Sequence, residues 1–230
     1  LAASARQSNM LSGDLLKRME SGKFITFEGG EGAGKSTQIK LLKTALETAN
    51  IPVIATREPG GSSGAETIRN LLLNPEKDWD TPTETLLHFA ARADHFTTRI
   101  APALKNGDCV LCDRFADSTR AYQGYGLGLD IKAIEILYEL TLGEFKPDLT
   151  LILDIPVQIG TMRLQDRGKA TDRYEQMDSA FHQRLREGFL DIAKNEPERC
   201  VVIDATADID TIALIIKNCV ANRLGLSLLK

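Results

Sequence analysis

A phosphate-binding loop is indicated by one glycine-rich run that ends in a lysine and a hydroxyl residue. The run matches the pattern G-x-x-x-x-G-K-[ST] and consists of Gly29, Gly30, Glu31, Gly32, Ala33, Gly34, Lys35 and Ser36. Glycines let backbone N–H groups turn inward around phosphate oxygens, and the N-terminus of a following helix adds its dipole. From a solvent-facing loop, Lys35 is expected to reach the β- and γ-phosphates of ATP. The Ser36 hydroxyl would ligate Mg²⁺, and Thr37 would complete the nucleotide site.

Two common classes of nucleotide-binding protein lack support in the sequence. The loop by itself predicts nucleotide binding and no particular reaction. A regulatory GTPase would carry an N-K-x-D motif, and no Asn in the chain is followed by Lys. A large ATPase motor would carry two acidic residues after an apolar strand, whereas Asp154 is followed by Ile155. A small-molecule kinase remains, with a module that binds nucleotide to regulate a partner as the alternative.

Further polar motifs follow along the chain in a set order. They are TREPGG at 56–61, AAR at 90–92, DRF at 113–115, STRAYQG at 118–124 and DRYE at 172–175. In this order and spacing they resemble the motifs of bacterial thymidylate kinases, a family of P-loop nucleoside monophosphate kinases. The resemblance extends over about 24–204, most of the chain.

The resemblance implies a reaction and its requirements. The γ-phosphate of ATP would be transferred in line to dTMP, giving ADP and dTDP for dTTP synthesis, with Mg²⁺ as the cofactor. The acceptor phosphate is already an anion, so positioning and charge neutralisation should matter more than a strong general base. A homodimer packed through helices is also implied. A P-loop kinase for another monophosphate or a small metabolite is the alternative enzyme.

Residues after the third strand and in a long helix would bind the acceptor. Asp113 and Arg114 lie at the carboxyl end of a predicted parallel strand, where open α/β sheets bind ligands. The resemblance implies that Arg114 clamps the dTMP phosphate with its planar fork, while Asp113 organises the loop, Mg²⁺ or that arginine. Arg92 would read the carbonyl edge of the thymine. A buried structural Asp–Arg pair and a solvated helix arginine are the simpler explanations.

The resemblance adds further positions to the acceptor site. Glu31 would lie near the acceptor sugar and Mg²⁺, and Tyr122 would disfavour a ribose 2′-hydroxyl. The remaining members of the acceptor set are Pro59, Arg69, Thr119 and Gln123. A surface glutamate, an ordinary packed tyrosine and a solvated Arg69 are the alternatives here.

A lid over the ATP phosphates is expected at about 163–176, where the chain is polar and poor in large aliphatic residues. Some thymidylate kinases carry a basic residue in the phosphate loop just after the acid, at the position of Gly32, and others supply an arginine from the lid. Arg167, and after it Arg163, are therefore the candidates for a catalytic lid arginine. A solvated charged face is the alternative, because Lys169 and Arg173 accompany these arginines.

One position departs from the family pattern. Thymidylate kinases usually place Phe or Tyr four residues before the base-reading arginine, on the same helix face. Here that residue is His88, and the adjacent Phe89 should point about 100° further round the helix, into the core. We predict that His88 stacks on the thymine; the alternative is a shifted helix that presents Phe89.

Alternating apolar runs and helical patterns predict the elements that carry these residues. Five β-rich runs span 24–27, 52–56, 109–112, 149–154 and 200–204. Helices are predicted at 35–49, at 83–105 with a bend near Pro102, at 131–142 and at 178–194. This alternation predicts an α/β P-loop kinase fold, with a five-stranded parallel sheet, helices on both faces and a small mobile lid. We assign 23–230 to a single kinase domain and 1–22 to a poorly ordered N-terminal extension.

Length, charge and cysteine usage narrow the class further. The 230 residues are 43% hydrophobic and 26% charged, which is ordinary for one soluble domain. A net charge of −4 argues against a dedicated nucleic-acid surface, and no apolar run suits a membrane span. Cys109 and Cys112 should point to opposite faces of a strand as small buried side chains, not share a metal ion. Such cysteine usage fits a reducing cytoplasm.

Overall fold

Five parallel strands form the centre of the molecule. The computed structural model describes residues 22–74, 77–165 and 173–228. The strands are β1 (Phe24–Glu28), β2 (Val53–Arg57), β3 (Cys109–Asp113), β4 (Leu149–Asp154) and β5 (Cys200–Asp204). They lie in the order β2-β3-β1-β4-β5, and each neighbouring pair is parallel. The predicted fold class is confirmed, as are the five predicted strands to within one residue at each end.

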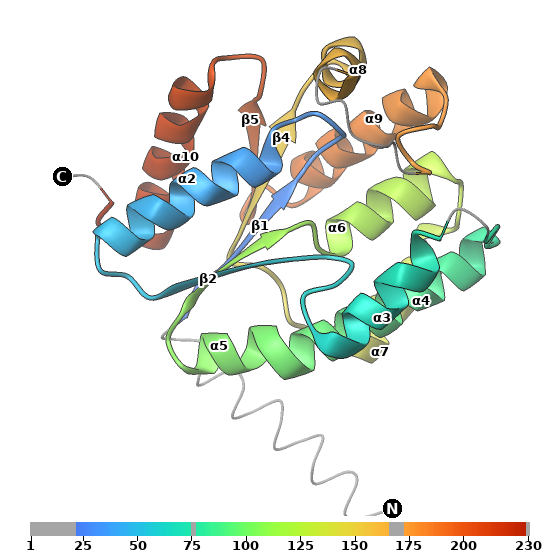
Figure 1. Cartoon of the computed structure of the whole chain (residues 1–230), viewed down its shortest axis with the longest axis horizontal. Helices are drawn as coiled ribbons and strands as arrows, with labels where there is room; N and C mark the ends of the chain where they lie inside the picture. The colour runs from blue at the N-terminus through green and yellow to red at the C-terminus, as the bar shows by residue number, and fades with distance from the viewer. Residues whose placement is uncertain (1–21, 75–76, 166–172, 229–230) are drawn as a thin grey trace, which may run out of the picture.

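Helices connect the strands and cover both faces of the sheet (Figure 1). Their bounds are α2 (Lys35–Thr48), α3 (Ser63–Leu72), α4 (Thr81–His95), α5 (Ala101–Lys105), α6 (Ala116–Thr119), α7 (Ile131–Leu142), α8 (Val157–Gln165), α9 (Ser179–Asn195) and α10 (Ile209–Leu224). Two π-helical segments, η1 (Phe96–Ile100) and η2 (Arg120–Gly126), continue α4 and α6. Among the described residues, none of the helices combines the length and apolar character needed to cross a membrane.

Three apolar cores join these helices to the sheet, and two of them meet at β1. Ile25 of β1 packs in one core with Leu42 of α2 and Ile216 of α10. The helices α2 and α10 lie side by side in Figure 1. On the other face, Phe24 belongs to a core with Phe89 of α4. Adjacent residues of β1 thus serve opposite cores, as the alternation of side chains along a strand requires. A sheet covered on both sides explains why its strands are nearly continuous apolar runs.

The two cysteines of β3 follow the same alternation. Cys109 lies in the core beneath α2 and α10, whereas Cys112 lies in the core beneath α4 and α7. Both thiols are buried. The prediction that they point to opposite faces of the sheet is confirmed, and this geometry prevents them from sharing one metal ion.

Helix boundaries agree with the prediction in most, but not all, cases. The bounds of α7 are as predicted, and those of α2 and α9 differ by one residue. The predicted helix at 83–105 is three segments, with the π-helical turn η1 ahead of Pro102, which lies in the first turn of α5. Helices α3, α6, α8 and α10 were not predicted. The Asp208 side chain, which accepts from the Thr211 N–H at 2.9 Å, was an available start signal for α10.

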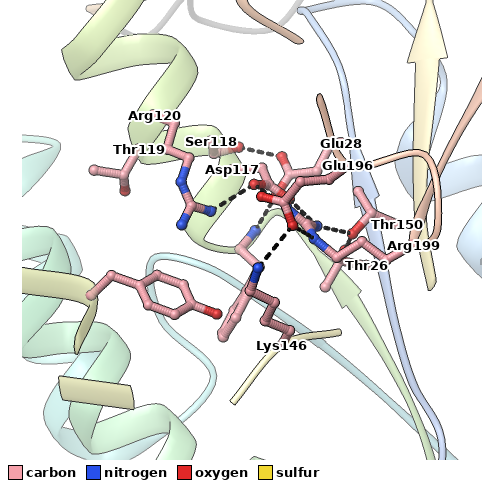
Figure 2. A network of polar contacts seen from close by, with 12 residues as sticks. Thr26, Glu28, Asp117, Ser118, Thr119, Arg120, Lys146, Thr150, Glu196 and Arg199 are labelled. Atoms are coloured by element: carbon pink, nitrogen blue, oxygen red, sulfur yellow. Dashed lines mark hydrogen bonds and ion pairs between the residues drawn. The ribbon is translucent and has the colours of Figure 1, made fainter. Parts of the chain in front are cut away.

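A buried charge network holds α6 against the sheet (Figure 2). Asp117 accepts from Arg199 at 2.6 and 2.9 Å and from Arg120 at 2.8 Å. Arg199 also donates to Thr150 Oγ1 of β4 at 2.8 Å, and the Thr150 hydroxyl pairs with that of Thr26 on β1 at 2.8 Å. A buried carboxylate bound by two guanidinium groups has its charge compensated. The helix that follows β3 is therefore fixed relative to β4.

Candidate active site

The phosphate loop follows β1 directly and curls over the start of α2. Gly29 and Gly34 have positive φ angles of 128° and 87°, which a side chain would resist. Lys35 is only 7% exposed, because its Nζ donates to the carbonyl oxygens of Gly29 at 3.0 Å and Gly30 at 2.9 Å. The loop is partly exposed, as expected, but the Lys35 side chain is folded back onto it. Burial, together with the positive charge of Arg114, lowers the pKa of Lys35 to about 8.

The two predicted metal ligands, Ser36 and Asp113, lie together. Ser36 Oγ donates to Asp113 Oδ2 at 2.7 Å, because β3 is next to β1 in the sheet. A hydroxyl and a carboxylate are oxygen donors of the kind that Mg²⁺ prefers, so this pair fits the predicted ion. Elsewhere in the loop, Ala33 is buried in the core, and the Thr37 N–H donates to the Gly34 carbonyl at 3.1 Å.

Arg114 combines a left-handed backbone with a buried guanidinium group. Its φ is 68°, a conformation that costs a residue with a side chain about 1–3 kcal/mol. Its NH2 donates to Glu31 at 2.6 Å, and its NH1 donates to the Gly29 carbonyl at 3.0 Å and to Ser118 Oγ at 3.3 Å. The guanidinium carbon lies 4.9 Å from the centre of the Tyr122 ring. Arg114 therefore joins the phosphate loop to α6 and η2.

Glu31 is an acid held by cations, not a surface glutamate. Its Oε1 accepts from both Arg114 and the Tyr122 hydroxyl. Burial by itself would raise the pKa of this carboxyl, but the charges of Arg114 and Lys35 outweigh it and hold the pKa at about 2. Glu31 is therefore ionised throughout the neutral range. An ionised carboxylate that is already bound by a guanidinium suits positioning better than proton transfer.

An open cleft lies beside Arg114. All nine residues predicted to bind the acceptor line it. They come from the phosphate loop, the turn after β2, the helices α3 and α4, and the segment that follows β3. Arg69 of α3 donates to the Pro59 carbonyl at 2.6 Å at the mouth of the turn. The fold therefore gathers into one cleft residues that are far apart in the sequence.

Arg92 is buried in the wall of this cleft, and among the described residues its NH1 nitrogen has no hydrogen-bond acceptor. It is 2% exposed, which excludes a solvated helix arginine. Its Nε donates to Glu58 at 2.7 Å, and its NH2 donates to the Phe115 carbonyl at 3.1 Å and to Thr119 Oγ1 at 3.0 Å. Within the described part of the chain, its NH1 has no hydrogen-bond partner. A buried N–H without an acceptor is costly, so a ligand carbonyl in the cleft would be favoured here.

Glu58 orients Arg92 and is itself held by a histidine. Glu58 Oε1 lies 3.0 Å from His95 Nδ1, and His95 Nε2 lies 2.6 Å from Thr56 Oγ1. His95 is fully buried. A Cβ on Gly61 would lie 2.3 Å from His95 Nε2, so this glycine allows the turn after β2 to pack on the ring. The relay from Thr56 to Arg92 fixes the arginine within the wall of the cleft.

His88 faces the cleft, while Phe89 points into the core. Phe89 is 1% exposed and its ring centre lies 4.8 Å from the Arg92 guanidinium carbon. His88 Nε2 lies 3.3 Å from the Tyr174 hydroxyl. Burial, with the positive charges of Arg92 and Arg173 nearby, lowers the pKa of His88 to about 3. The predicted direction of Phe89 is confirmed, and stacking of His88 on a base stays a prediction.

The C-terminal end of the expected lid reaches the cleft through one buried carboxylate, that of Glu84. Glu84 of α4 is fully buried and accepts from the Tyr174 hydroxyl at 2.6 Å and from Gln123 Nε2 at 2.7 Å. Arg173 NH1 lies 2.8 Å from the other oxygen of Glu84. Gln123 is thus held by α4 in the wall of the cleft, beside Tyr174.

Only the two ends of the expected lid fall within the described residues. Arg167 lies outside them. Arg163 of α8 donates to the Ala205 carbonyl at 2.9 Å, beyond the end of β5, and not to the phosphate loop. A Cβ on Gly32 would lie 2.3 Å from the Gly160 carbonyl oxygen of α8. Close packing of the loop on α8 therefore explains why Gly32 carries no basic side chain.

Comparisons with known proteins agree with this geometry. A family model described as "Thymidylate kinase" matches residues 27–214. The chain is 55% identical over 209 residues to the thymidylate kinase of Caulobacter vibrioides, covering 90% of this chain and all of that protein. The chain belongs to the thymidylate kinase family. The thymidylate kinase of Nitrobacter hamburgensis is 55% identical over 195 residues, covering 84% and 85% of the two chains. A crystal structure of thymidylate kinase from Ehrlichia chaffeensis superposes with a TM-score of 0.71 at 39% identity, covering 87% of this chain and 98% of that one.

Several contacts of this thymidylate kinase family member were missed by sequence reasoning. Glu58 and Tyr174 line the cleft, and both stand in motifs that the sequence singled out without giving them a role. Glu84 and His95 stand in α4 outside any motif, and their partners lie far away along the chain. Burial of a charged or titratable side chain was the signal that would have found them, and it is visible only in the fold.

The burial of His88 predicts that its imidazole does not titrate near neutral pH in this thymidylate kinase family member. The pKa of His88 in the folded chain is about 3, below the ordinary value of 6.5. Between pH 3 and pH 6.5, His88 therefore binds its proton in the unfolded chain but not in the folded one. The stability that neutral His88 contributes is therefore full above about pH 6.5 and is lost as the pH falls toward 3. Proton NMR from about pH 5 to 8 should show flat His88 shifts, assigned by their loss in His88→Phe. A midpoint near the ordinary value would contradict the buried environment.

Proposed function

We propose that this chain transfers the γ-phosphate of ATP to dTMP, giving dTDP and ADP. The observation that carries the proposal is a single cleft that runs from the unpaired donor of Arg92 to Arg114 beside the phosphate loop. A base would lie at the Arg92 end, and its phosphate would lie at the Arg114 end, next to the donor nucleotide. Membership of the thymidylate kinase family supports the same reaction.

Recognition of the base would rest on Arg92 and His88. The NH1 of Arg92 presents a donor, which suits a thymine carbonyl oxygen. Cytosine places an amino group at the same edge, so a donor would face a donor and leave the guanidinium unsatisfied. His88 lies one turn earlier on α4 and lines the same cleft, where its neutral ring can stack on the base. Tyr122 would lie against the sugar.

The two phosphate groups would be held by different elements. Arg114, supported by Glu31 and approached by Arg69 across the cleft, would bind the acceptor phosphate. Lys35 and the amides of the loop would bind the β- and γ-phosphates of ATP. Ser36 and Asp113 would hold Mg²⁺, which when bound neutralises phosphate charge during transfer.

The chemistry requires alignment more than proton transfer. The acceptor phosphate is already an anion, and Glu31, with a pKa of about 2, remains a charged positioning group. Lys35 and Arg114 bring positive charge to the two sides of the transferred group, where charge develops in the transition state. Holding two reactants in line can contribute several kcal/mol to lowering the barrier, roughly 7–11 kcal/mol in the best intramolecular cases.

A coupled assay of ADP release tests the proposed function. With Mg²⁺ and ATP, dTMP should be used in preference to dCMP, dGMP and dAMP. Arg92 offers a donor to a carbonyl edge, where cytosine and adenine present an amino group. Removal of the divalent ion with a chelator should abolish turnover. Lys35→Ala should remove most of kcat, which controls for a contaminating kinase, while circular dichroism should show an intact fold. Equal turnover with dCMP would refute the assignment of dTMP as the acceptor.

A second prediction concerns the lid arginine. We propose Arg167, since the Arg163 guanidinium is bound to the Ala205 carbonyl and Gly32 leaves no room for a cation in the loop. Arg167→Ala should lower kcat by roughly 10³–10⁵, the range for arginines that complete a phosphoryl-transfer site, and change dTMP binding little. Arg163→Ala is the matched control variant, and its kcat should fall far less than that of Arg167→Ala. The reverse order would assign the role to Arg163, and two active variants would refute a lid arginine.

The family resemblance implies a homodimer packed through helices, and we further propose that α4 and α7 form the contact. Leu86 of α4 and Ile136 and Leu140 of α7 are 55%, 66% and 79% exposed, and the two helices pack against each other. Apolar side chains gathered on adjacent helices favour burial against a partner surface. Sedimentation velocity should give twice the chain mass of 25.3 kDa, and Leu140→Glu should shift it toward one chain mass. Ile209→Glu, on the distant α10, is the control; a monomeric wild-type chain would contradict the proposal.

We also propose a cytoplasmic location. The four cysteines are free, and three of them are buried. Burial raises the pKa of the Cys109 and Cys200 thiols to about 12, so the reactive thiolate is scarce at neutral pH. Free, unreactive thiols are typical of proteins from reducing compartments.

A further inference from the structure

Glu28 is a buried carboxylate at the end of β1, one residue before the phosphate loop. Its side chain is fully buried. Oε1 accepts from the Phe115 N–H at 2.7 Å, and Oε2 accepts from the Ser118 hydroxyl at 2.6 Å. Figure 2 shows Glu28 and Ser118 joined on the α6 side of the charge network. Both partners are neutral, and in the part of the chain that the structure describes neither oxygen forms an ion pair.

These bonds enclose the strained backbone of Arg114. The Arg114 N–H donates to the Phe27 carbonyl at 2.9 Å, and the next amide, that of Phe115, donates to Glu28. Two successive amides after β3 thus bind two successive residues of β1, one through its backbone and the other through its side chain. A left-handed conformation at a residue with a side chain persists only when its surroundings impose it. The Phe27 carbonyl holds the amide of Arg114 itself, and Glu28 holds the next amide, that of Phe115. Glu28 therefore helps to impose the left-handed conformation of Arg114.

Ser118 links the same carboxylate to the guanidinium group. Its hydroxyl donates to Glu28 and accepts from Arg114 NH1 at 3.3 Å, which one hydroxyl can do at once. Arg114 NH1 also donates to the carbonyl of Gly29, the residue that follows Glu28. Glu28 therefore controls Arg114 from two directions, through the turn that carries it and through the partners of its side chain.

Stability does not account for a carboxylate in this place. Burial, and after it the charge of Asp117, raises the pKa of Glu28 to about 7 from an ordinary 4.5. Between these values the folded chain keeps a proton that the unfolded chain releases, so folding stability falls as the pH rises from about 4.5 to 7. A neutral side chain of the same shape would be at least as stable above that range.

We propose that Glu28 is a positioning residue that keeps Arg114 aligned with the phosphate loop. Its carboxylate fixes the turn after β3 and the Ser118 hydroxyl, so that the arginine for the acceptor phosphate and the loop for the donor phosphates keep one geometry. This inference rests on the proposed function, which assigns the acceptor phosphate to Arg114. Glu28 itself does not touch the substrate.

The test begins with Glu28→Gln in the whole chain. Glutamine keeps the shape, but its amide nitrogen cannot accept from Ser118 while its oxygen accepts from Phe115. We expect kcat to fall about 10- to 100-fold, the range for a misplacement of roughly 1 Å, with the KM for ATP changed less than about threefold. The melting temperature at about pH 8 should be unchanged or raised, which a merely structural role would not produce.

Variants of Ser118 and Thr26 make the test independent of folding defects. Ser118→Ala should lower kcat, and Ser118→Thr, which keeps the hydroxyl, should restore it. Thr26→Val is the matched control, because Thr26 lies two residues before Glu28 on the same face of β1 and loses one buried hydrogen bond to Thr150, away from Arg114. Thr26→Val should lower the stability of the fold, because one buried hydrogen bond is lost. It should leave kcat within about twofold, because the turn after β3 keeps its hydrogen bonds to β1.

The outcomes separate this inference from the proposed function. Normal kcat in Glu28→Gln overturns the inference, as does an equal loss of kcat in Thr26→Val. If Glu28→Gln does not fold, equal kcat in Ser118→Ala and Ser118→Thr overturns it instead. A wild-type chain that does not phosphorylate dTMP in the same assay overturns the proposed function and, with it, the assignment of Arg114. An active wild type with unaffected variants overturns this inference alone.

Discussion

The ion pair between Arg114 and Glu31 is the contact on which both halves of the site depend. Glu31 belongs to the loop after β1, and Arg114 belongs to the turn after β3, the neighbouring strand. Their side chains are only 17% and 16% exposed, so solvent screens the attraction less than it would at the surface. Arg114 also donates to the Gly29 carbonyl, and charge-assisted hydrogen bonds of this kind are strong and directional. The donor loop and the acceptor cleft therefore share one rigid junction at the carboxyl edge of the sheet.

Each buried cation of the cleft has an acid supplied by a different element. Arg92 of α4 is paired with Glu58, which follows β2, and Arg114 is paired with Glu31. Such pairing offsets the cost of taking charges out of water, but it adds little net stability by comparison with an apolar core. Its benefit is geometric, because each guanidinium plane is held by fixed acceptors while part of it still faces the cleft. Two pKa values near this junction are lowered, with opposite effects on charge. The charges of Arg114 and Lys35 outweigh burial and hold the pKa of Glu31 at about 2, so the acid is firmly ionised. Burial, with the charge of Arg114, lowers the pKa of Lys35 to about 8, so the lysine is less firmly charged.

Glycines mark where backbones come too close for side chains. Gly32 of the phosphate loop meets Gly160 of α8, and Gly61 of the turn after β2 meets the ring of His95. The first contact joins the loop to the helix that leads into the expected lid, and the second holds that turn at the edge of the acceptor cleft. A side chain at either glycine would force backbone or a buried ring to move, so these positions control the shape of the site.

Local patterns in the sequence determined the strands and the phosphate loop, and the family resemblance supplied the residues that line the cleft. Apolar runs of strand length and a glycine-rich motif between a strand and a helix are local signals. The order and spacing of the family motifs predicted nine residues that line one cleft in the fold. Only the tertiary structure decided how those residues are held. It buried Lys35 in its own loop, turned Arg163 to the Ala205 carbonyl, and placed Glu28, Glu84 and His95 behind the ligand-facing side chains. Such contacts depend on which strands are neighbours and on how deeply a charge is buried. Those are properties of the packed sheet and its helices, and no local spacing of residues encodes them.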